Sequence, residues 1–236
     1  MRLDVDILSK TFESASGKRH EVLSDVRFSL VAGEVGVLIG PSGCGKSTLL
    51  RILAGLDPDF EGTVSRPPHL RIGMVFQEPR LLPWRTVEDN VRIAVQTIDE
   101  AGLSTLFAAL DLSEHRSHFP GELSLGLARR VALARAFAIE PDILILDEPL
   151  ASLDGALAAR MRDAIADFAA KPSRMTLLVT HDFDDAVRLG DRLIILSERP
   201  ARILHVVPIG TPRASRSEAE IATLESELTH LNLTGK

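Results

Sequence analysis

The segment Gly40-Pro-Ser-Gly-Cys-Gly-Lys-Ser47 decides the fold of this chain, because it fits the pattern G-x-x-x-x-G-K-[ST]. Before it, residues 34–39 are typical of a short buried strand, and after it residues 48–54 are typical of a helix that ends at Gly55. A strand, a glycine-rich turn and a helix N-terminus together surround an anion with backbone N–H groups, and the helix dipole adds partial positive charge. The segment therefore predicts a loop that binds the phosphates of a nucleoside triphosphate.

The residues of this loop have separable tasks. Lys46 can reach the β- and γ-phosphates, and the Ser47 hydroxyl can ligate Mg²⁺. Cys44 is expected to contribute its backbone N–H and a small side chain rather than a nucleophile. The residues expected to contact the nucleotide here are Gly40, Pro41, Ser42, Gly43, Cys44, Gly45, Lys46, Ser47 and Thr48.

A second motif ends in two adjacent carboxylates, in the segment Ile143-Leu-Ile-Leu-Asp147-Glu148-Pro149. A buried strand would deliver both side chains at its carboxyl end, where ligands of open α/β sheets bind. Successive side chains of a strand point to opposite faces, so the two carboxylates can differ in role. We expect Asp147 to hold Mg²⁺ and Glu148 to act as the general base that polarises the attacking water.

Composition excludes several classes of function. The chain has 236 residues, 45% of them hydrophobic, and a net charge of −6, which leaves no electrostatic footprint for nucleic acid. No stretch approaches the roughly 20 apolar residues of a membrane span, and the N-terminus lacks the apolar region of a secretory signal. Cys44 is the only cysteine, so an intrachain disulfide is impossible and a reducing cytoplasm is expected.

Hydrophobic patterning predicts an α/β fold. Residues 3–8 and 22–30 alternate like strands of a small antiparallel sheet, whereas residues 143–146, 176–179 and 193–196 are solid apolar runs typical of parallel strands buried on both faces. We expect a single domain. Its nucleotide-binding core would comprise 1–77 and 140–212, with a helical subdomain at 78–139 and an amphipathic C-terminal helix or tail at 213–236.

Together these motifs resemble the ATP-binding subunits of ABC transporters over nearly all of residues 3–200. The resemblance implies that Phe12 stacks on adenine and that Gln77 links Mg²⁺ and water to a membrane partner. It further implies that Ser152-Leu-Asp154 crosses a dimer interface, and that His181 contacts the γ-phosphate. The implied fold is a phosphate-loop NTPase core with a small antiparallel sheet and an inserted helical subdomain.

The sequence departs from this family in its signature, where Leu123-Ser-Leu-Gly-Leu127 stands for Leu-Ser-Gly-Gly-Gln. Ser124 and Gly126 match the signature, which in the family offers N–H groups to the γ-phosphate held by the opposite subunit. Leu125 replaces the first glycine. If its side chain points away from the nucleotide, hydrolysis survives; if it points inward, closure is impaired and the subunit only binds ATP.

The resemblance implies an ATP-hydrolysing, energy-coupling subunit of an importer, at the cytoplasmic face of the inner membrane as a peripheral protein. Its partners would be a second copy or a related ATPase subunit, an integral membrane permease and, indirectly, a solute-binding protein. Residues 78–84 are similar to subunits that serve nitrate, sulfonate and taurine importers. The alternatives are a soluble ABC-type ATPase of DNA repair, translation or complex assembly, and a phosphate-loop kinase.

Two further segments carry expectations. Ser217 and Glu220 fit a capping box ahead of apolar residues spaced by three and four, which predicts an amphipathic helix laid on its own domain or on a partner subunit. Trp84 lies between Pro83 and Arg85, a composition typical of interfaces, and is expected to receive a cytoplasmic helix of the permease unless it packs inside the helical subdomain.

Overall fold

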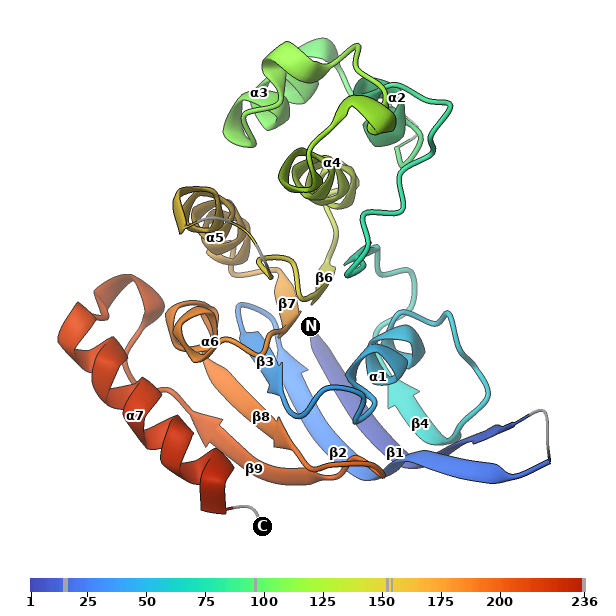
Figure 1. Cartoon of the computed structure of the whole chain (residues 1–236), viewed down its shortest axis with the longest axis vertical. Helices are drawn as coiled ribbons and strands as arrows, with labels where there is room; N and C mark the ends of the chain where they lie inside the picture. Colours follow the sequence, from blue (N-terminus) through green and yellow to red (C-terminus); the bar gives the residue numbers. More distant parts are fainter. Residues whose placement is uncertain (15–16, 96, 152, 154, 235–236) are drawn as a thin grey trace.

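A computed structural model of the chain describes residues 1–14, 17–95, 97–151, 153 and 155–234. Two sheets and a group of helices make up the molecule (Figure 1). The α/β fold expected from the sequence, with its small antiparallel sheet and inserted helices, is confirmed. No helix in the described ranges is long and apolar enough to cross a membrane.

The larger sheet has six strands in the order β5-β6-β7-β3-β8-β9, all parallel except β9. The solid apolar runs of the sequence form its centre, as expected for strands that are buried on both faces. The strands are β3 (Val35–Ile39), β5 (Ile72–Val75), β6 (Ile143–Asp147), β7 (Met175–Val179), β8 (Arg192–Leu196) and β9 (Ile203–Pro208).

Successive side chains of these strands point to opposite faces of the sheet and pack in two separate hydrophobic cores. Along β6, Leu144 and Leu146 join one apolar cluster with the helices, while Ile143 and Ile145 join the other with β1, β2 and α1. The sheet thus separates two layers. The helices outside the insertion are α1 (Lys46–Leu53), α5 (Gly155–Ala169), α6 (Phe183–Leu189) and α7 (Glu218–Thr234).

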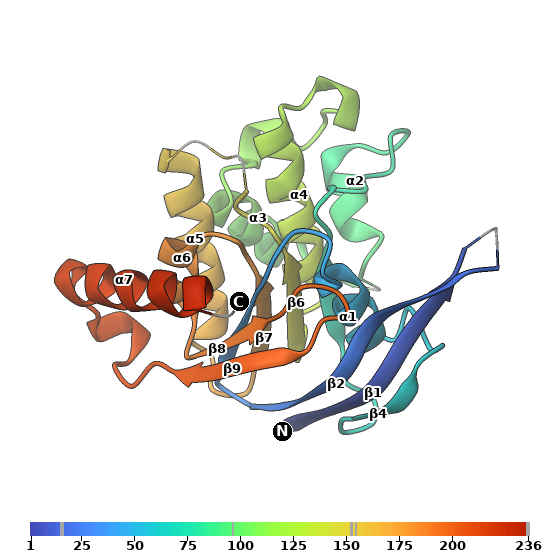
Figure 2. The same cartoon turned by 60° about the horizontal axis from the view of Figure 1, so that its bottom comes forward.

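The smaller sheet is antiparallel, with the order β2-β1-β4 (Figure 2). Its strands are β1 (Arg2–Glu13), β2 (Arg19–Val31) and β4 (Glu61–Ser65), so the first two extend beyond the alternating runs of the sequence. Leu3, Val5 and Ile7 point inward from β1 and are almost fully buried. The alternating pattern therefore predicted the buried face of β1 correctly, but it did not include the polar residues at the ends of the two strands.

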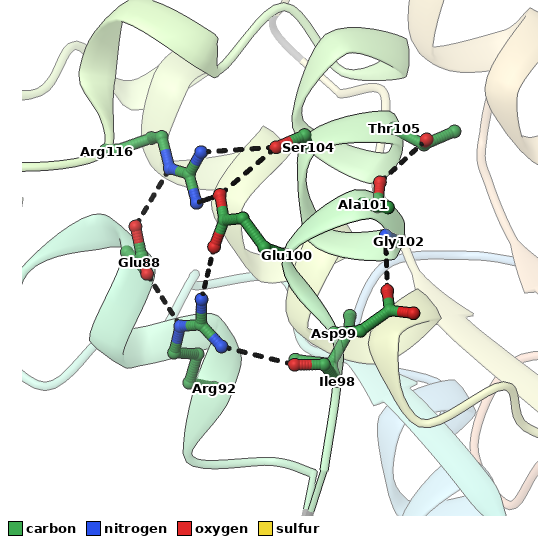
Figure 3. Close-up of polar contacts among 10 residues, drawn as sticks. All are labelled: Glu88, Arg92, Ile98, Asp99, Glu100, Ala101, Gly102, Ser104, Thr105 and Arg116. Atoms are coloured by element: carbon green, nitrogen blue, oxygen red, sulfur yellow. Dashed lines mark hydrogen bonds and ion pairs between the residues drawn. The ribbon is translucent and has the colours of Figure 1, made fainter.

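Three helices lie together at one end of the molecule (Figure 1): α2 (Val87–Arg92), α3 (Glu100–Ala109) and α4 (Leu125–Ala138), of which α4 packs against β5. Short 3-10 turns, Ser113–His115 and Pro120–Glu122, join α3 to α4. Figure 3 shows the charged contacts that fasten α2 to α3: Arg116 bonds both Glu88 (2.8 Å) and Glu100 (2.5 Å), and Arg92 bonds the same two carboxylates (2.6 and 2.8 Å).

The C-terminal helix α7 begins with the expected capping box. The backbone N–H of Ser217 donates to the Glu220 carboxylate (2.8 Å), and the backbone N–H of Glu220 donates to the Ser217 hydroxyl (3.3 Å). Ile221 and Leu228 are buried against the domain, and Arg188 of α6 pairs with Glu218. This helix therefore packs on its own chain, which is one of the two arrangements expected from the sequence. The short 3-10 helix η3 (Arg213–Ser215) precedes it.

Candidate nucleotide-binding site

The glycine-rich loop runs from the end of β3 into α1, and its glycines are required by backbone conformation and space. Gly43 has a φ of 75° and Gly45 a φ of 132°, both in the region that favours glycine. A Cβ on Gly45 would lie 2.8 Å from a methyl group of Val22, and one on Gly40 would lie 3.1 Å from Leu196. Cys44 is buried in the core beneath the loop, in keeping with a packing side chain.

Lys46 and Ser47 begin α1 and face the carboxyl end of β6. The ammonium of Lys46 donates to the carbonyls of Gly40 (2.7 Å) and Pro41 (2.9 Å), so it lies over the loop that precedes it. Burial raises the pKa of the Asp147 carboxyl, while a hydrogen bond from Ser47 and the charge of Lys46 oppose that rise. A buried carboxylate beside a hydroxyl is a donor set of hard oxygens, which fits Mg²⁺.

Glu148 follows Asp147 with an unusual backbone. Its φ of 49° is left-handed, a conformation that costs a non-glycine residue about 1 kcal/mol and that recurs at functional sites. The turn directs the carboxylate toward two side chains, because Oε2 lies 3.5 Å from Gln77 Nε2 and 3.5 Å from His181 Nδ1. The structure thus brings together Gln77, Glu148 and His181, which are 71 and 33 residues apart in the sequence.

All of these residues lie at the carboxyl ends of parallel strands: Gly40 after β3, Gln77 after β5, Asp147 at the end of β6 and His181 after β7. Gln77, Glu148 and His181 border one cavity of about 360 Å³ together with the phosphate loop. Ligands of open α/β sheets bind at this edge, where loops and helix N-termini converge. The residues that line the cavity are Ser42, Gly43, Gly45, Lys46, Ser47, Thr48, Gln77, Glu148, His181 and Arg199.

Arg199 is the lining residue that the sequence analysis missed. It follows β8, and its Nη2 donates to the Gly43 carbonyl at 2.7 Å. The sequence offered one signal for Arg199, its place shortly after the apolar run at 193–196. Residues that follow neighbouring parallel strands lie at the same edge of the sheet. Recognising it required the knowledge that β8 lies beside β3, which the sequence does not state.

Other expected site residues lie elsewhere. Phe12 is half-exposed near the end of β1, where the Lys10 ammonium lies 4.6 Å from its ring centre, and it does not line the phosphate cavity. Ser124 caps α4 by accepting a hydrogen bond from the Leu127 N–H (3.2 Å), and a Cβ on Gly126 would lie 2.5 Å from Leu157. Ser152 and Asp154, expected at a dimer interface, fall outside the described residues.

The geometry can support attack of water on a terminal phosphate. The loop and Lys46 can neutralise phosphate oxygens, and Ser47, Asp147 and Gln77 would hold a Mg²⁺ ion that would supply further positive charge to the phosphates. Glu148 can accept the proton of a water placed beside Gln77 and His181. Because Lys46 and Glu148 come from different strand ends, only the folded sheet creates this arrangement. The fold and the site define a phosphate-loop ATPase.

Comparison with known proteins identifies the family of phosphate-loop ATPases to which the chain belongs. The ABC transporter family profile matches residues 23–151, more than half of the chain. The chain therefore belongs to the ABC transporter family, as an ATP-binding and ATP-hydrolysing subunit.

Individual relatives resemble the chain along its length. The Aliphatic sulfonates import ATP-binding protein SsuB 2 of Pseudomonas syringae pv. tomato is 42% identical over 234 residues, which cover 98% of both chains. The corresponding Bacillus subtilis SsuB protein is 39% identical over 218 residues, 89% of this chain and 85% of the relative. A solved dimeric structure of MJ0796, a bacterial ABC transporter cassette, has a TM-score of 0.79 at 26% identity, covering 90% of this chain and all of that one.

Proposed function

We propose that this protein is the ATP-hydrolysing, energy-coupling subunit of an importer for aliphatic sulfonates or closely related small anions. The observation that carries the proposal is the 42% identity, across 98% of both chains, to a protein named for aliphatic sulfonate import.

The proposed chemistry assigns each residue a task. The phosphate loop holds the nucleotide, Ser47, Asp147 and Gln77 hold Mg²⁺, Glu148 is the general base, and His181 contacts the γ-phosphate. Support comes from the cavity that the loop, Gln77, Glu148 and His181 share and from the 3.5 Å contacts of Glu148 with Gln77 and His181. Asp147 is buried beside Ser47, which lines that cavity. Phe12 would stack on the adenine, and its exposed ring is consistent with that role.

The proposed working unit is a pair of ATPase subunits, either two copies or one copy with a related chain. Each nucleotide would lie between the phosphate loop of one subunit and Ser124 and Gly126 of the other, with Asp154 at the interface. Support comes from the exposed start of α4, where Leu125 is 54% exposed, and from the dimeric form of the MJ0796 cassette. ATP would close the pair and hydrolysis would reopen it.

The proposed contact with a membrane permease is the surface around Trp84. Its side chain is 68% exposed, so it does not pack inside the helical subdomain. The fully buried Asn90 accepts from the Leu82 N–H (2.8 Å) and donates to the carbonyls of Arg85 (3.1 Å) and Thr86 (2.9 Å). A rigid loop that presents an exposed tryptophan is suited to a partner, because little conformational freedom is lost on binding.

The proposed location follows from that contact: the protein would be peripheral, at the cytoplasmic face of the inner membrane, with a solute-binding protein on the far side. The test is reconstitution of the protein with the permease encoded beside it in proteoliposomes. We expect uptake of an alkanesulfonate that depends on ATP and on the solute-binding protein, with sulfate as the competitor control. ATP hydrolysis without alkanesulfonate uptake would contradict the assigned solute but not the ATPase.

A further inference from the structure

We propose that Arg199 is a further nucleotide-binding residue, which holds the phosphate loop and donates hydrogen bonds to the phosphates of the bound nucleotide. The inference rests on the nucleotide site proposed above. The Nη2 of Arg199 donates to the carbonyl of Gly43 at 2.7 Å, and Arg199 lines the same cavity as Lys46 and Ser47. The site thus contains a second cation, supplied from a strand end that carries no part of the loop itself.

The sheet places Arg199 beside the loop. Strands β3 and β8 are parallel neighbours, with Ile39 opposite Ile195, so the segment after β8 emerges next to the loop that follows β3. The loop after β3 packs closely against the end of β8, because a Cβ on Gly40 would lie 3.1 Å from Leu196, the last residue of β8.

The segment that carries Arg199 is fastened on both sides. The N–H of Ala201 donates to the Val22 carbonyl (2.8 Å), and the N–H of Ser24 donates to the Ala201 carbonyl (3.0 Å). Within the turn, the Ser197 hydroxyl donates to the Pro200 carbonyl (3.2 Å) and accepts from the Arg202 N–H (3.0 Å). A guanidinium on such a turn is held in position before a ligand arrives, which reduces the entropy lost on binding.

Charge favours an anion as the ligand of Arg199. A guanidinium has five N–H donors, and among the described residues one hydrogen bond is found for Arg199, to the Gly43 carbonyl. By contrast, Arg202 three residues later turns to the Ser24 hydroxyl (3.2 Å), away from the cavity. Arginine matches phosphate oxygens in a two-pronged geometry, so the open donors of Arg199 are suited to a phosphate group.

The test is titration calorimetry of the full chain with ATP, ADP and AMP in the presence of Mg²⁺. We expect Arg199→Met to weaken ATP binding about 10-fold, ADP binding less, and AMP binding not measurably, because the lost partner is a phosphate chain. Arg199→Lys keeps the positive charge but loses the two-pronged guanidinium, so its affinity for ATP should lie between those of wild type and Arg199→Met. Arg202→Met is the matched control and should bind all three nucleotides like wild type.

Two further measurements separate the possible failures. Lys46→Ala should abolish ATP binding; if it binds ATP normally, the nucleotide site itself is wrong, whatever Arg199 does. If Lys46→Ala loses binding while Arg199→Met binds normally, or loses all three nucleotides equally, Arg199 does not contact phosphate and only this inference fails. Melting without nucleotide checks folding, and if Arg199→Met unfolds, the same comparison of ATP with AMP in Arg199→Lys decides the question.

Discussion

Glu148 combines a strained backbone with a carboxylate that reaches the cavity from the end of a buried strand. The preceding residue Asp147 is 6% exposed, whereas the Glu148 side chain is 17% exposed and lies between Gln77 and His181. The left-handed turn at Glu148 therefore separates the two carboxylates into a buried one beside Ser47 and one that faces the cavity. The different roles proposed for the two carboxylates rest on this separation.

We expect Glu148→Gln to bind ATP normally and to hydrolyse it about 10²–10⁴-fold more slowly, because the general base is lost while size and shape persist. It should also accumulate an ATP-bound dimer, which size-exclusion chromatography detects. The control is Glu140→Gln, since Glu140 also has a left-handed backbone (φ of 45°) but does not line the cavity. Unchanged turnover in Glu148→Gln would remove this residue from the mechanism.

Leu125 is the residue by which this chain departs from the family signature. It is the first residue of α4, and its exposed side chain contributes little to the core of its own subunit. We therefore expect the effect of this side chain on hydrolysis to arise in the closed pair.

We expect Leu125→Gly to raise both ATP hydrolysis and ATP-dependent dimerisation, because a bulky side chain at the closing surface is removed. Light scattering with ATP and a phosphate-release assay measure the two effects. Ile93→Gly, which removes an equally exposed side chain beyond the end of α2, should change neither. A large loss of activity in Leu125→Gly would mean that this leucine makes a specific contact across the interface.

At the scale of elements, the ion-pair network of Figure 3 joins α2, α3 and the segment before α4. A hydrogen bond from Arg92 is the main cause that lowers the pKa of Glu88 below its ordinary value of 4.5; burial opposes this, and a hydrogen bond from Arg116 lowers the pKa further. A lowered folded-state pKa adds stability above the unfolded-state value, and that stability is lost as the pH falls below about 4.5.

We therefore expect Glu88→Gln to lower the free energy of unfolding at pH 7 by about 1 kcal/mol, since the network is partly exposed. The difference from wild type should shrink as the pH falls through 4.5 and below, and also in high salt. Urea unfolding across pH measures it, with Glu21→Gln as a control carboxylate on β2. A difference independent of both pH and salt would assign the loss to packing instead.

The helix α7 contributes stability rather than nucleotide contacts. Besides Ile221 and Leu228, its approach is held by Arg213, which pairs with Asp191 at 2.8 Å, and by the buried Arg216, which donates to the Val187 carbonyl. We expect truncation after Pro212 to lower the free energy of unfolding by at least about 3 kcal/mol, from the two apolar side chains alone. Calorimetric ATP affinity should persist; lost dimerisation at an unchanged melting temperature would instead indicate a partner contact.

At the scale of the whole molecule, the surface around Trp84 is the one proposed to transmit closure of the ATPase pair to the permease. We expect Trp84→Ala to abolish alkanesulfonate uptake in proteoliposomes while ATP binding and the melting temperature of the isolated subunit stay unchanged. An interface anchor of this kind contributes at least about 2 kcal/mol to binding. Leu204→Ala on β9 removes an exposed side chain elsewhere and should transport normally. Normal transport by Trp84→Ala would place the coupling surface elsewhere.

Local motifs alone determined much of this protein. The glycine pattern, the solid apolar runs and the Asp147-Glu148 pair each depend on neighbours within a few residues, so strand, loop and helix could be predicted from them. Even the capping box of α7 follows from the hydrogen bonds that Ser217 and Glu220 make to each other's backbone. The alternating runs predicted the inward faces of β1 and β2 for the same reason.

Tertiary structure decided which strand ends meet. The order β5-β6-β7-β3-β8 is set by pairing between segments far apart in the chain, and no local pattern encodes it. That order brings Arg199 to Gly43 across 156 residues and Gln77 to Glu148 across 71. It also decides that α7 packs on its own domain and that Trp84 stays exposed, because burial depends on which distant surfaces are present to cover a side chain.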